Sequence, residues 1–76
     1  MSDVKRLIPP EIWMQQVFDA KAARQGGVVR RSRRDIDRTV GWPMFEAELR
    51  RRGYHAVENS GQVVIFCNNA PIRVLV

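Results

Sequence analysis

Residues 28–67 read VVRRSRRDIDRTVGWPMFEAELRRRGYHAVENSGQVVIFC, and several local structural patterns follow one another in this stretch. The run Val28–Arg30 is short and rich in β-branched residues, which favours a brief strand. Ser32 is a good helix N-cap and Gly41 a good C-terminal stop, so the spacing predicts a helix over 33–40. The first part of the stretch therefore predicts a strand followed directly by a short helix.

A second short helix is expected immediately afterwards, over 43–52. Pro43 suits the first helical turn, where a missing N–H costs nothing. Phe45 and Leu49 are four residues apart and form its inward pair, while Gly53 is a suitable C-cap. Two short helices joined by so tight a turn are typical of a helix-turn-helix unit.

Beyond this unit the hydrophobic period changes to two. Residues 54–59 and 62–68 alternate on either side of Asn59-Ser60-Gly61-Gln62, which predicts a β-hairpin because glycine accepts a positive φ. After a turn at 68–71, the segment Ile72–Val76 alternates again and predicts one added C-terminal strand.

Upstream of the quoted stretch, one longer helix is expected over 10–25. Trp13, Val17 and Ala20 recur on one face, and Gly26-Gly27 ends the pattern. A chain of 76 residues has room for one small domain, so we expect an N-terminal tail over 1–9 and a single domain over 10–76.

This order of elements resembles the winged helix-turn-helix domain. Val28–Arg31 resembles its first strand, Ser32–Gly41 its second helix, Pro43–Gly53 its third helix and Tyr54–Cys67 its hairpin wing. The likeness covers about residues 10–68, and the strand at 72–76 is an addition to it. The resemblance implies an α+β fold of order α-β-α-α-β-β. It also implies that the third helix enters the DNA major groove, although many such domains bind proteins instead.

The net charge of +5 is concentrated in the middle of the chain. Residues 24–52 hold nine arginines, no lysine and four acidic residues, whereas the segments on either side are neutral. Arginine presents a planar fork of donors that matches phosphate and guanine. The charge pattern therefore indicates a polyanionic partner.

Two sets of residues are candidates for contact with duplex DNA. The phosphate contacts would come from the second helix and its approach: Arg30, Arg31, Arg33, Arg34 and Arg38. The residues facing base edges would come from the third helix: Ala47, Arg50 and Arg51. An alternative stays open for the third helix, because Glu46 and Glu48 have the i,i+4 spacing that pairs them with arginines of the same helix.

No set of residues in the sequence suggests catalysis. The single histidine, His55, and the single cysteine, Cys67, offer no cluster with metal-ligand spacing, and no nucleophile, base and orienting group can be assembled. Trp13 and Trp42 are expected to pack in the core. We therefore expect a non-enzymatic protein with no cofactor, no metal and no small-molecule substrate.

The location expected from the sequence is cytoplasmic. A lone cysteine forms no intramolecular disulfide, and the longest apolar run, 63–67, is too short to cross a bilayer. No signal-peptide pattern is present at the N-terminus, and no membrane partner is expected.

The function expected from these patterns is duplex DNA binding, as in a small transcriptional regulator. The alternative is a protein-interaction module that uses the segment Ile72–Val76 as an edge strand, joining a homodimer or a larger protein partner. A third interpretation is that Val74 and Val76 simply close the core.

Overall fold

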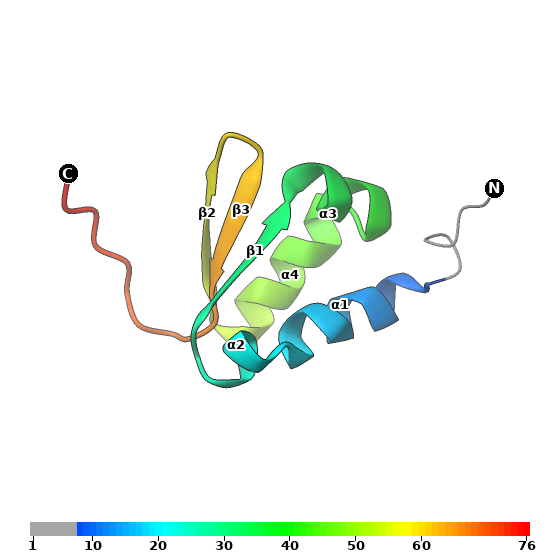
Figure 1. Ribbon diagram of the computed structural model, residues 1–76, viewed down its shortest axis with the longest axis horizontal. Coiled ribbons are helices and arrows are strands. Elements are labelled where there is room, and N and C mark those ends of the chain that lie inside the picture. The colour runs from blue at the N-terminus through cyan, green and yellow to red at the C-terminus, as the bar shows by residue number, and fades with distance from the viewer. Residues whose placement is uncertain (1–7) are drawn as a thin grey trace.

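The computed structural model describes residues 8–76, so most of the tail expected over 1–9 lies outside the described residues. Within the described part, four helices accompany one three-stranded antiparallel sheet, which makes the fold α+β as predicted (Figure 1). The elements in chain order are α1 (Pro10–Asp19), α2 (Lys21–Arg24), β1 (Val28–Ser32), α3 (Arg33–Thr39), α4 (Trp42–Arg52), β2 (His55–Asn59) and β3 (Gln62–Phe66).

The sheet has the strand order β1-β3-β2, so β3 is central and both other strands lie at edges. Val29 of β1 and Ala56 of β2 both pair with Ile65 of β3. The helices lie to one side of the sheet in Figure 1. Accordingly, Val29 and Ile65 are buried, whereas Val28 and Val57 on the opposite face are almost half exposed.

An aromatic cluster centred on Phe45 joins the helices. The Phe45 side chain is fully buried, and its ring centroid lies 5.8 Å from Trp42, 6.1 Å from Phe18 and 6.2 Å from Trp13. Both tryptophans are partly buried against the core, as the sequence predicts. The inward pair of α4, Phe45 with Leu49, is likewise confirmed.

The predicted capping and turn residues lie at the ends of the short helices and in the hairpin turn. The Ser32 hydroxyl caps α3 by accepting a hydrogen bond of 3.0 Å from the Asp35 N–H. Gly53 ends α4 at φ 76°. The hairpin turn places Ser60 at φ 48° and Gly61 at φ 78°, the two positive angles of a type I′ turn.

The single helix expected over 10–25 is wrong, because Ala20 interrupts it. Ala20 has an extended backbone (φ −56°, ψ 145°), and the chain restarts as α2. The change of direction brings Ala23 into the core at 4% exposure, and the Gly27 N–H then donates to the Ala22 carbonyl at 2.8 Å. Residues 10–25 contain no helix-breaking residue near Ala20, so tertiary packing rather than local propensity interrupts the helix there.

The added strand predicted at Ile72–Val76 is also wrong, because these residues belong to no strand and the segment runs away from the sheet (Figure 1). The Asn68 side chain donates to the Gly26 carbonyl at 3.0 Å and accepts from the Ala70 N–H at 3.0 Å, which turns the chain at the end of β3. Pro71 then offers no N–H to a sheet. Val74 is 85% exposed and Val76 fully exposed, so they do not close the core.

Candidate nucleic-acid interface

Three arginines at the junction of β1 and α3 have no acidic partner among the described residues. Arg30 and Arg34 are exposed, and Arg31 is half-buried with its Nη1 donating to the Arg30 carbonyl at 2.7 Å. Among residues 8–76, none of the three forms an ion pair with a carboxylate. We call Arg30, Arg31 and Arg34 the junction arginines. They are cations within five consecutive residues whose charge no neighbouring carboxylate neutralises.

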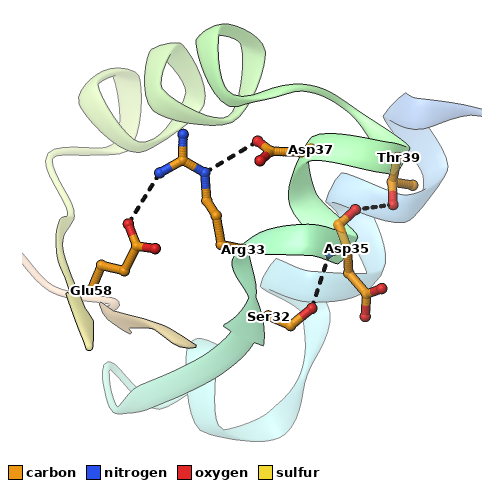
Figure 2. Close-up of polar contacts among 6 residues, drawn as sticks. All are labelled: Ser32, Arg33, Asp35, Asp37, Thr39 and Glu58. Atoms are coloured by element: carbon orange, nitrogen blue, oxygen red, sulfur yellow. Dashed lines mark hydrogen bonds and ion pairs between the residues drawn. The ribbon is translucent and has the colours of Figure 1, made fainter. Parts of the chain in front are cut away.

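Arg33, which lies between them in sequence, has different surroundings (Figure 2). Its Nε donates to Asp37 at 3.1 Å, and its Nη1 donates to Glu58 of β2, also at 3.1 Å. The guanidinium carbon lies 4.4 Å from the centre of the Trp42 ring, within reach of a cation–π interaction. The hydrogen bond to Asp37 is the main cause that raises the pKa of Arg33. Two of its donors are therefore directed at carboxylates of α3 and β2, and its guanidinium lies over a ring of α4.

Arg38, the fifth predicted phosphate contact, has one weak acidic partner. Its Nη2 donates to Asp35 at 3.3 Å, and both side chains are about half exposed. The Thr39 hydroxyl donates to the Asp35 carbonyl in the same turn (Figure 2). An exposed pair of this kind contributes about 0.2–1 kcal/mol, so a phosphate group can readily replace it.

The predicted base-facing residues Ala47, Arg50 and Arg51 are all exposed on α4. Both arginines, however, are held by acids of the same helix. Arg50 donates twice to Glu46, with a shortest distance of 2.8 Å, and Arg51 forms a two-pronged pair with Glu48 at 3.0 and 2.6 Å. The pairing that the i,i+4 spacing left open is present in the structure.

Glu48 also binds Arg52, whose Nε donates to it at 2.6 Å. The hydrogen bond from Arg51, supported by that from Arg52, lowers the pKa of Glu48 to about 2. This carboxylate is therefore ionised at any physiological pH. The positive charge of the last turn of α4 is correspondingly reduced.

A groove runs between α4 and β2, with a volume of about 280 Å³. Its lining includes the mainly apolar residues Trp42, Leu49, Tyr54 and Val63 together with the acids Glu46 and Glu58. We call it the α4–β2 groove. Arg50 also lines the groove, and both carboxylates are paired, Glu46 with Arg50 and Glu58 with Arg33.

The structure thus separates the predicted arginines into two kinds that sequence reasoning treated alike. The spacing Arg33–Asp37 is visible in the sequence and could have marked Arg33 as an intrahelical partner. The contact with Glu58 joins residues 25 positions apart and depends on how the hairpin packs against α3. No local signal reports it.

Other reactive side chains are dispersed. Within residues 8–76 no group of three or more His, Cys, Asp or Glu residues is placed to hold a metal ion. Cys67 is buried as a small core residue, and that burial raises the pKa of its thiol. His55 is exposed at the start of β2. In the described part of the chain, no helix has the length and apolar character needed to cross a membrane.

Comparisons of the chain with models of known protein families, with curated proteins and with solved structures gave no match.

Proposed function

We propose that this protein is a non-enzymatic winged helix-turn-helix protein that binds duplex DNA, acting as a small transcriptional regulator. The order of its elements and the sheet order β1-β3-β2 support this architecture, with α3 and α4 as the helix-turn-helix and β2–β3 as the wing. The segment from β1 through α3 carries five arginines against two aspartates.

The observation that carries the proposal is that the junction arginines are free of acidic partners in the described chain. A guanidinium that already holds a carboxylate must exchange it for a phosphate, and the exchange gains little. A guanidinium in water instead adds a charge-assisted contact and releases a counterion from the DNA. The phosphate contacts are therefore expected from the junction arginines together with Arg38.

The role of α4 follows from the same reasoning. Ala47 leaves room for the helix to approach a groove, but Arg50 and Arg51 reach a base only by leaving Glu46 and Glu48. Sequence readout by α4 is accordingly weak, and binding to the DNA backbone supplies most of the affinity.

A salt titration on duplex DNA tests the proposal. The logarithm of affinity should fall linearly with the logarithm of salt concentration. Arg34→Ala and Arg38→Ala should each reduce that slope by about one. Arg24→Ala is the matched control, because Arg24 is also exposed but lies on α2, away from the junction in the chain. Fluorescence anisotropy with a labelled duplex gives the slopes.

Two outcomes would reject the proposal. One is the absence of duplex binding at about 50 mM salt, where non-specific electrostatic binding is strong. The other is a decrease in the salt-dependence slope for Arg24→Ala as large as that for Arg34→Ala. That result would mean that binding depends on net charge and not on the junction arginines.

A further inference from the structure

The segment Ile72–Val76 presents an alternating apolar pattern in a conformation without sheet partners. Val74 and Leu75 are 85% and 78% exposed and Val76 is fully exposed, far more than the other large apolar residues among residues 8–76. The start of the segment is anchored, since Asn68 bonds to the Gly26 carbonyl at the base of the sheet. A fixed origin and an apolar end with backbone groups unpaired are the properties of a strand that adds to another sheet.

Two sheet edges are open to such a strand, and they differ chemically. At β1 the Arg30 carbonyl already accepts a hydrogen bond from the Arg31 guanidinium, so it is not free to pair with an added strand. The side chains of Arg30 and Arg31 are also both cationic. At β2 every second residue directs its backbone groups outward, as in any edge strand. The β2 edge presents Val57, which is 44% exposed, and Glu58. Glu58 already binds Arg33, but through Oε1 alone, so Oε2 is left to accept from a second guanidinium. A segment that carries Arg73 therefore suits β2 and is repelled by β1.

An antiparallel alignment with β2 makes the three central pairs of side chains complementary. When Val74 lies opposite Val57, Arg73 falls opposite Glu58, and Leu75 falls opposite Ala56. Ala56 and Glu58 line the α4–β2 groove, so Leu75 would enter its apolar part. A groove of about 280 Å³ is at the lower limit of ligand pockets and suits a single side chain.

The chain cannot reach this alignment on its own sheet. The segment leaves from the end of β3 that lies beside His55, whereas Ile72 would have to start beside Asn59 at the other end of β2. The six Cα–Cα steps from Phe66 to Ile72 span at most about 22 Å when extended, and Asn68 is tied to Gly26 within that stretch. The stretch would have to run the length of β2, cross two strand spacings of about 4.8 Å each and then reverse direction. The complementary edge therefore belongs to another molecule.

We propose that two copies of this chain exchange the segment Ile72–Val76, each adding it as an antiparallel strand to the β2 edge of the other. Each chain supplies both halves of the contact, so two copies satisfy both edges. The exchange covers the exposed valines and leucine and fills the α4–β2 groove of each copy with Leu75. It is independent of nucleic acid.

Paired charge substitutions in the full-length chain test the register, with sedimentation velocity in the absence of DNA as the readout. Val57→Glu and Val74→Arg should each raise the dimer dissociation constant about tenfold or more, since either one places a charge against a valine. The double variant places Glu opposite Arg and should recover most of the loss. The control is Val28→Glu, an equally exposed valine on the same sheet face but on β1, which should leave the constant unchanged.

All three valines are exposed, so their substitution should not disrupt the core, and circular dichroism verifies that each variant is folded. A dimer that weakens in both single variants and recovers in the double variant supports the exchange. If the protein is still a monomer at millimolar concentration, the exchange is overturned, and the segment would then bind a different protein. Growth beyond two copies, or equal weakening by Val28→Glu, also overturns it.

Discussion

Glu48 accepts hydrogen bonds from Arg51 and Arg52, and its side chain is only 20% exposed. Two like charges three and four residues along the same helix are thereby held by one carboxylate. Arg52 also lies 4.4 Å above the Phe18 ring, so Glu48 orients a cation that covers the core between α1 and α4. Its ionisation state therefore affects packing as well as surface charge.

The lowered pKa of Glu48 predicts an acid-dependent loss of stability. Because the folded chain binds this proton less readily than the unfolded chain, the stabilisation is complete above the ordinary pKa of a glutamate. It disappears as the pH falls from about 4.5 to about 2. Glu48→Gln should cost on the order of 1 kcal/mol at neutral pH, allowing for solvent screening.

The measurement is urea unfolding at a series of pH values. The difference between wild type and Glu48→Gln should shrink across that acid window. A difference that stays constant from neutral pH to pH 2 would contradict the role of the ionised carboxylate. Glu11→Gln is the control, since Glu11 is an exposed glutamate on α1 that forms no ion pair within the described residues.

At the scale of elements, Arg33 joins α3, α4 and β2 through Asp37, Trp42 and Glu58. Because α3 is only seven residues long, few of its side chains can pack against the other elements. A single long side chain with three partners then determines how the hairpin sits against the helix pair.

Arg33→Ala should consequently lower the melting temperature by a few degrees, and Arg34→Ala should leave it nearly unchanged. The comparison is matched in residue type and helix position, and thermal unfolding followed by circular dichroism measures it. In the DNA titration the order should reverse, with Arg34→Ala the more damaging of the two. Equal effects of both variants in both assays would refute the assignment of Arg33 to stability and Arg34 to DNA binding.

The elements that the sequence predicts well are those that begin or end at a capping or turn residue. Ser32, Gly53 and the Ser60-Gly61 turn each specify one local conformation, and α3, α4 and the hairpin appear within about two residues of expectation. The interruption at Ala20 has no such residue, because it follows from the fit of Ala23 under the sheet. The segment at 72–76 has the alternation of a strand, but its own sheet offers no edge in the right direction.

The candidate site divides in the same way. Exposure of Ala47, Arg50 and Arg51 follows from helical periodicity and could be predicted. Which arginines remain free depends on distances between side chains, and periodicity contains no information about them. The sequence therefore located the basic segment, and the side-chain geometry distinguished the junction arginines from Arg33.

At the scale of the whole molecule, Phe45 and the three rings around it form the centre of a thin core. A domain of this size buries a smaller share of its surface than a larger domain does, so each large buried side chain contributes much of its stability. Phe45 contacts two rings from α1 and the Trp42 ring at the start of α4, and no other residue joins as many aromatic groups in the described chain.

Phe45→Ala should therefore cost about 3–5 kcal/mol, which is comparable with the whole stability of a small domain. We expect the variant to be largely unfolded at 25 °C by near-ultraviolet circular dichroism, which reports the packing of Trp13 and Trp42. Its neighbour Met44, 40% exposed on the same helix, provides the control as Met44→Ala. A variant that kept the wild-type near-ultraviolet signal would show that the ring cluster is dispensable.

The backbone N–H of Arg33 donates to the Gly61 carbonyl at 2.8 Å, which joins the tip of the hairpin to the start of α3. Hairpin tips are ordinarily the places where an extra residue or an inserted peptide is best tolerated. Here the length of the turn fixes the position of that carbonyl, and one added residue would leave the first N–H of α3 without its acceptor. The tip of this hairpin is therefore a poor site for loop grafting, and a longer hairpin would have to be accompanied by a new cap for the helix.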